Sequence, residues 1–290
     1  MKALIIGGCS WDTLIKVGDI HSLEKDMSLW ADNVVETVGG TGAGKALCLD
    51  TLGYDYTWIT EIGNDIFGQK ITQYLDLRKV QYLSMDVDKS TAHTNIMHSG
   101  GDRISVFTSS PTKESKPYHK IEEIIIESDL VYLNINQFCR QYIPLIKKHN
   151  KKVIVDLHDY NIGNPYHQDF IDIANVLTVS GVYITDQTSF LKQMIKNGKE
   201  IVIITNGNEG SIAMDSSGSI YKTPSYQQIE YVDSNGAGDS FCAIFGMEYY
   251  ATKNIGKSLQ LAAICGAMSC TTFDLFPNEI TIEDIKKRVE

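Results

Sequence analysis

The chain has 290 residues, with 36 acidic side chains against 26 basic ones and a formal charge of −10. No Gly/Ser tract, charge block or low-complexity run marks a linker, so we expect a single domain over residues 1–290. The acidic balance and the lack of a basic stripe argue against a nucleic-acid partner. No apolar run approaches the roughly 20 residues of a membrane span. The six cysteines form no C-x-x-C pair, as is typical of small core residues in a reducing compartment, and we expect a cytoplasmic protein.

Strand-like and helical segments alternate along most of the chain. Apolar runs of strand length lie at 2–7, 34–38, 56–60, 103–108, 130–135, 152–156, 175–179, 201–204, 211–215 and 229–232. Segments with helical spacing lie at 43–52, 66–77, 120–127, 140–149, 186–197, 238–251 and 255–272. This alternation predicts an α/β fold of three layers, α/β/α, with a mostly parallel central sheet covered by helices on both faces.

The segment Asp-Ser-Asn-Gly-Ala-Gly-Asp at 233–239 is the most informative one. It follows a strand-like run and opens an apolar helix, so the N–H groups around Gly236 and Gly238 and the helix dipole favour an anion. Asp239 adds a carboxylate beside that anion site. A proton acceptor next to amides that hold a phosphoryl group is the minimum apparatus for phosphorylating an alcohol. The alternative is an acidic first turn favoured by the dipole alone.

A second glycine motif, Gly-Gly-Thr-Gly-Ala-Gly-Lys-Ala at 39–46, lies between the strand-like run 34–38 and a helix that ends at Gly53. It comes within one residue of a P-loop, G-x-x-x-x-G-K-[ST]. Ala46 stands where a hydroxyl should hold magnesium. The motif therefore argues against a P-loop.

Together the two motifs resemble those of the ribokinase-like (PfkB-type) kinases of sugars and nucleosides, which carry G-G-x-x-x-N-x-A early and D-T-x-G-A-G-D late. Three further segments resemble the same family in chain order: a first strand that ends in Asp12, a G-x-D-x-x-G segment within 62–68, and a T-x-G-x-x-G nucleotide loop at 205–210. The resemblance extends along nearly the whole chain. It implies an ATP-dependent kinase that phosphorylates a hydroxyl, such as a hydroxymethyl group, of a sugar or modified sugar.

The resemblance also implies roles for individual residues. The expected catalytic group is Asp239 as general base, with an anion hole formed by Gly236, Ala237 and Gly238. The expected sugar-binding residues are Asp12, Gly39, Gly40, Gly44 and Arg103. The expected nucleotide-binding residues are Thr205, Gly207, Gly210 and Asn235.

Two stretches break the alternation of strands and helices. Residues 12–38 show no helical period, and residues 91–108 read as two strands around Ser-Gly-Gly-Asp at 99–102. In the resembling family these places supply a small β-sheet lid over the sugar, and we expect one here, the alternative being an ordinary hairpin. Arg103, at the hairpin tip, is then a candidate for contact with an anionic substituent, against the alternative of a solvated side chain.

The implied cofactors are ATP and Mg²⁺, but several positions depart from the family pattern. Ser-Gly-Val-Tyr at 180–183 replaces the N-x-x-E that orders magnesium, so we expect the metal to be held mainly by nucleotide phosphates and water, the alternative being Asp156. Asp233 resembles a position that helps to bind a monovalent cation. The matching loop at 272–276 lacks glycine, which argues against K⁺ activation. The family's asparagine is Gly44 here.

Two alternative functions stay open. A nucleoside kinase is the nearest, because the same scaffold accepts both substrate classes. A non-catalytic sugar sensor is the other, since the metal and substrate motifs are degraded, although a pure binding module has no need of Asp239. The expected partner is a small sugar-like molecule, and whether two lids pair in a homodimer is left open.

Overall fold

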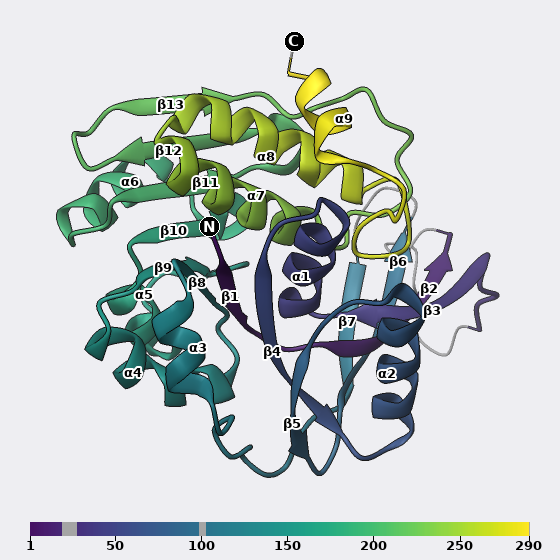
Figure 1. Cartoon of the computed structure of the whole chain (residues 1–290). Helices are drawn as coiled ribbons and strands as arrows, with labels where there is room; N and C mark the ends of the chain where they lie inside the picture. Colours follow the sequence, from purple (N-terminus) through teal and green to yellow (C-terminus); the bar gives the residue numbers. More distant parts are fainter. Residues whose placement is uncertain (19–27, 99–102, 290) are drawn as a thin grey trace.

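The computed structural model describes residues 1–18, 28–98 and 103–289, and the side chains of His98 and Arg103 lie outside that description. In this part of the chain the larger sheet has nine strands, which in spatial order are β13 (Ile220–Thr223), β12 (Ser211–Asp215), β11 (Ile201–Thr205), β10 (Val176–Ser180), β9 (Lys152–Asp156), β8 (Leu130–Leu133), β1 (Ala3–Ile6), β4 (Tyr56–Gly63) and β5 (Leu83–Val87) (Figure 1). Neighbouring strands from β5 to β11 in this order are parallel, whereas β12 is antiparallel to both β11 and β13. The predicted mostly parallel sheet is confirmed.

Helices cover both faces of this sheet. One face carries α1 (Thr41–Thr51), α2 (Ile66–Arg78), α7 (Ala237–Thr252), α8 (Ile255–Ser269) and α9 (Ile282–Lys287). The other carries α3 (Ile121–Glu127), α4 (Ile143–Lys148), α5 (Gln168–Ile173) and α6 (Gln187–Lys196). None of the described helices combines the length and the apolarity needed to cross a bilayer.

Strand β1 shows why the central strands read as unbroken apolar runs. Successive side chains of a strand point to opposite faces. Ala3 and Ile5 accordingly join the core under α1 and α7, while Leu4 and Ile6 join the core under α3 to α6. All four are fully buried. A sheet covered on both faces therefore needs apolar residues at every position, which confirms the three-layer prediction.

A separate four-stranded sheet lies beside the central one, and we call it the lid. In spatial order its strands are β3 (Asn33–Gly39), β2 (Ser10–Val17), β6 (Thr91–His98) and β7 (Arg103–Ser109). The strands β2 and β6 are parallel, and each outer strand is antiparallel to its neighbour. These are the two stretches from which a lid was expected. The expected turn at 99–102 lies outside the described residues.

Three details of the predicted elements are wrong. Asp12 does not end the first strand but lies within β2, because β1 ends at Ile6 and a new strand starts at Ser10. Residues 229–232 form no strand: the N–H of Val232 donates to the carbonyl of Cys270 just after α8, so this backbone pairs with a helix end. Short elements were missed, namely the strands β5 and β13, which carry polar residues among the apolar ones, and the six-residue helices α5 and α9.

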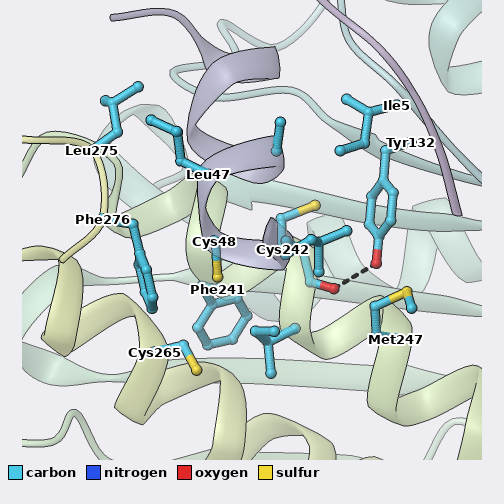
Figure 2. Packing of buried hydrophobic residues seen from close by; sticks show 14 of the residues in the cluster. Ile5, Leu47, Cys48, Tyr132, Phe241, Cys242, Met247, Cys265, Leu275 and Phe276 are labelled. Carbon is cyan, nitrogen blue, oxygen red and sulfur yellow. Dashed lines mark hydrogen bonds between the residues drawn. The ribbon is translucent and has the colours of Figure 1, made fainter. Parts of the chain in front are cut away.

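The core between α1, α7 and α8 fixes the position of α7. Leu47 and Cys48 of α1 pack with Phe241 of α7 and Cys265 of α8 (Figure 2). The buried hydroxyl of Tyr132 on β8 donates a hydrogen bond to the carbonyl of Ala243, the contact drawn dashed in Figure 2. Helix α7 is thus tied to the sheet by a polar contact as well as by apolar packing.

We expect Tyr132→Phe to lower the free energy of unfolding by about 0.5–1.5 kcal/mol, the net value of one buried hydrogen bond. Urea denaturation followed by circular dichroism measures the change. Tyr183→Phe is the matched control, since its ring is 57% exposed, and it should leave stability unchanged. Equal stability of the Tyr132 variant and the native protein would contradict the importance of this contact.

Candidate active site

A cavity of about 850 Å³ opens beyond the carboxyl ends of the parallel strands, where α/β sheets commonly bind ligands. Its walls include the last residues of β9, β10 and β11, which are Asp156, Ser180 and Thr205. The lid contributes the residues Asp12, His93, Asn95, Ser105 and Phe107. The beginnings of α1 and α7 complete the cavity. Residues that are distant in the sequence, such as Asp12 and Asp239, thus line one cavity.

Most of the residues singled out in the sequence lie at this cavity or beside it. Those that line it are Asp12, Gly40, Thr205, Gly207, Asn235, Gly236, Gly238 and Asp239. Ala237 and Gly210 line an adjoining hollow. Gly39 and Gly44 lie behind the cavity wall, against Asp12 and Asp239 respectively. Asp233 is buried near the end of α8, and the side chain of Arg103 lies outside the described part.

The start of α7 presents backbone N–H groups to the cavity. Gly236 has φ 81°, a left-handed conformation, and a Cβ there would lie 2.4 Å from the carbonyl oxygen of Leu275. The N–H of Ala237 donates to the carbonyl of Ser234 at 3.2 Å. Among the described residues, no backbone carbonyl outside the helices and strands accepts from the N–H groups of Gly236 and Gly238. The candidate anion hole therefore consists of the N–H groups of Gly236 and Gly238, whereas the sequence also suggested that of Ala237.

Asp239 is held by a buried lysine. The ammonium Nζ of Lys45 lies 2.6 Å from Oδ1 of Asp239 and 3.7 Å from Oδ2 of Asp156. Burial raises the pKa of Asp239, and the Lys45 charge opposes that rise. Burial also disfavours charge on Lys45, but Asp239, Cys242 and Asp156 together outweigh it and keep the lysine pKa above its ordinary value. Lys45 is therefore charged at neutral pH.

Lys45 is the main site residue that sequence reasoning missed. It belongs to the early glycine motif, but its partner Asp239 is 194 residues further along the chain, and only the packing of α1 against α7 brings them together. The preceding Gly44 makes the contact possible, since a Cβ there would lie 2.7 Å from both Cβ and Oδ2 of Asp239. The unusual glycine and lysine of the motif thus form one unit.

Asp156, His158 and Asp239 place three possible metal-ligand atoms within 4.8 Å of one another. Burial raises the pKa of Asp156, but His158, Lys45 and hydrogen bonds to the carboxylate together outweigh it and hold this pKa below its ordinary value. The ammonium of Lys45 already supplies a cation beside both carboxylates, and like charges repel strongly in a buried site. We therefore assign no metal ion to this group.

Asp12 lies at the lid end of the cavity in a network of hydrogen bonds. Its Oδ1 accepts from the hydroxyl of Ser10 at 2.7 Å and lies 3.0 Å from Nδ1 of His93. Its Oδ2 accepts from the amide of Asn95 at 3.2 Å. Gly39 passes so close that a Cβ would lie 2.2 Å from Oδ2. Asp12 is thus buried, at 4% exposure, and its carboxylate is fixed in place.

A smaller hollow of about 210 Å³ adjoins the cavity and shares Thr205, Gly207, Ser234 and Gly238 with it. Its remaining walls are largely apolar, and include Ile229, Phe241, Ala263 and Ala267. The cavity therefore has a polar centre with an apolar extension, which suits a ligand that has a charged part and a flat apolar part.

Comparisons with known proteins show the family of the chain and other proteins with the same fold. The sequence model described as "pfkB family carbohydrate kinase" matches residues 2–277. The chain is 23% identical to acarbose 7(IV)-phosphotransferase of Actinoplanes sp., over 92% of this chain and 91% of that protein. The solved structure of the microbiome-derived acarbose kinase Mak1 is similar, with a TM-score of 0.85 at 24% identity over 99% and 98% of the chains. Ribokinase of Arabidopsis thaliana, solved with ribose and ATP, has a TM-score of 0.80 at 18% identity over 99% and 98%.

We expect Gly236→Ala to destabilise the protein by at least about 1–2 kcal/mol, the cost of a left-handed backbone for a residue with a Cβ, to which the clash with Leu275 adds. Gly238→Ala is the matched control: a Cβ there meets nothing within 4 Å, so stability should stay the same or rise slightly. Urea unfolding of both variants measures the difference. Equal effects would contradict the role assigned to the Gly236 conformation.

Proposed function

This chain belongs to the pfkB family of carbohydrate kinases, and on that premise we propose that it transfers the γ-phosphoryl group of ATP to a hydroxyl group of a sugar or modified sugar. The observation that carries the proposal is the shared cavity. It places Asp239 and the N–H groups at the start of α7 in the same space as the fixed carboxylate of Asp12. A proton acceptor, an anion site and a sugar-binding carboxylate are the groups that this reaction needs.

ATP fits the two-part cavity. The apolar hollow beside Phe241 suits a planar base, and the glycines of the loop after β11 allow the nucleotide to lie close to the backbone. The phosphates then point toward the start of α7, where the helix dipole and free N–H groups favour negative charge. Mg²⁺ would be held by the phosphate oxygens and would neutralise part of their charge, and we assign no side chain to it.

In the proposed mechanism Asp239 accepts the proton of the attacking hydroxyl. Its Oδ1 is occupied by Lys45, whereas Oδ2 accepts no hydrogen bond within the described part of the chain. A positioned base contributes about 10²–10⁴-fold to the rate. The N–H groups of Gly236 and Gly238 would stabilise charge on the transferring phosphoryl group, because preorganised donors need no rearrangement during the reaction.

The acceptor sugar would lie under the lid, with hydroxyl groups donating to the carboxylate of Asp12. Because Ser10, His93 and Asn95 already fix this carboxylate, its orientation costs little when substrate binds. The rings of His93 and Phe107 pack at 80° to each other, with centroids 4.3 Å apart. Phe107 is 72% exposed and lines the cavity, so it offers an apolar face to the sugar ring.

We expect Asp239→Asn to reduce ADP formation by about 10²–10⁴-fold, because the amide cannot accept the proton. A coupled assay over sugars, amino sugars, sugar acids, fructosamines and nucleosides first identifies the acceptor and separates a sugar kinase from a nucleoside kinase. Ligands should still raise the melting temperature of the variant, since asparagine has nearly the same size and shape as aspartate and leaves the cavity unchanged. Turnover that matches the native enzyme would remove Asp239 from its assigned role, and binding without turnover across the panel by the native protein would favour a sensor.

We expect Asp12→Ala to raise the KM for the sugar about 10-fold or more, since a lost buried hydrogen-bond partner costs about 1–3 kcal/mol. Steady-state kinetics at saturating ATP measures the change. Glu36→Ala is the matched control, because Glu36 is an exposed lid carboxylate paired with Lys70 at the surface, and its KM should not change. An unaltered KM in the Asp12 variant would contradict this assignment.

A further inference from the structure

We propose that Lys45 is a positioning residue for the base: its ammonium holds one oxygen of Asp239, leaves the other for the substrate hydroxyl, and offsets the charge of Asp156 so that Asp239 stays ionised. The inference rests on the proposed function, because it takes Asp239 to be the proton acceptor. The geometry of Lys45, Asp239 and Asp156 carries it.

Lys45 acts on Asp239 and not on a ligand. The lysine is 2% exposed and is absent from the residues that line the cavity, so its ammonium does not reach a phosphate or a sugar. An ammonium has three hydrogens to donate. One meets Oδ1 of Asp239 at 2.6 Å, and the carbonyl of Thr41 accepts another at 3.4 Å. The carboxylate of Asp156, at 3.7 Å, is close enough for an ion pair.

The Asp239 carboxylate is held from two sides. The ammonium fixes Oδ1, and the backbone of Gly44 lies so close to Oδ2 that no side chain fits between them. Asp239 nevertheless lines the cavity and stays 8% exposed. With Oδ1 occupied, Oδ2 is the oxygen left to accept a proton from a hydroxyl in the cavity. Lys45 and Gly44 together thus determine which oxygen acts.

The second effect of Lys45 is on charge. Carboxylate oxygens of Asp156 and Asp239 lie within 4.8 Å of each other in a buried site, and a like charge so close disfavours ionisation and raises the pKa of its neighbour. Four titratable groups face Asp239: Lys45 on α1, Asp156 at the end of β9, His158 just after it, and Cys242 one turn along α7.

Lys45 is the group among these whose charge is both close and permanent. Burial raises the pKa of the Cys242 thiol to about 12, so this thiol is neutral near pH 7. His158 is half-buried, and its Nδ1 lies 3.4 Å from Oδ2 of Asp156, the other carboxylate. Without the ammonium, burial and Asp156 would both favour the protonated form of Asp239, and the base would be lost at higher pH.

The test is the pH dependence of kcat for the native enzyme, Lys45→Gln and Lys45→Met. Because Asp239 must be ionised to act, kcat falls on the acid side as pH drops through its pKa. We expect this acid limb to move to higher pH by roughly 1–3 units in both variants. Lys45→Gln keeps a donor for Asp239 and should retain more activity at high pH than Lys45→Met. A lower kcat with an unmoved acid limb in both variants would overturn the proposal, since it would indicate a merely structural lysine.

The substitution Asp156→Asn tests the same coupling in two ways. It should rescue the acid limb of kcat in a Lys45 variant, and by itself it should move that limb while position 45 stays native. In the double variant Lys45→Gln/Asp156→Asn, loss of the competing carboxylate should bring the acid limb back toward the native pH. In Asp156→Asn alone, the limb should move below the native position. If neither shift occurs, the coupling of the two carboxylates is contradicted. If the position-45 variants do not fold, Asp156→Asn alone still tests this coupling, and an unmoved limb contradicts it.

A direct titration separates this inference from the proposed function. NMR of the ¹³C-labelled aspartate carboxyls, with the Asp239 signal assigned by its loss in Asp239→Asn, reports ionisation without turnover. A native-like Asp239 pKa in Lys45→Gln would refute the role of Lys45 even if Asp239→Asn is inactive. Full activity of Asp239→Asn would instead remove Asp239 from its proposed role as proton acceptor, whatever the titration gives.

Discussion

The packing of α1 against α7 is the contact on which the arrangement of the site depends. Both helices begin at glycine motifs and lie on the same face of the central sheet (Figure 1), so their N-terminal ends reach one cavity from distant parts of the sequence. Most of the interface is apolar (Figure 2). Its polar end holds Lys45 and Asp239, and a buried charge is tolerated only with such a partner. The same interface therefore sets both the position and the charge of the carboxylate.

The cavity is divided between two structural sources. The central sheet and α7 supply a rigid half, in which strand ends carry Asp156 and Thr205 and a helix start carries the free N–H groups. The lid supplies the other half, in which Asp12 is held by neighbouring lid side chains rather than by the central sheet. Groups that are fixed before a ligand binds reduce the ordering cost of binding, and both halves are preorganised in this way.

Local signals made much of the fold predictable, and long-range contacts set the limit. The alternation of strands and helices, and the glycine starts of α1 and α7, are encoded within short segments, so the central sheet and the neighbourhood of Asp239 followed from sequence. The partner of Lys45 did not, because the ion pair exists only once two helices pack. The hydrogen bonds from His93 and Asn95 to Asp12 likewise depend on the register of β2 and β6. Residues 229–232 look like a strand, but a helix end takes their hydrogen bonds.

The lid is built from two excursions of the chain, one between β1 and α1 and the other between β5 and α3. Each leaves the central architecture and returns to it, so replacements within them leave the pairing of the nine-stranded sheet untouched. Substitutions in the lid can therefore change the cavity wall around Asp12 without moving the strand ends or the start of α7. The two inserts are therefore the places where the outer wall of the cavity can vary while the strand ends that form its floor keep their positions.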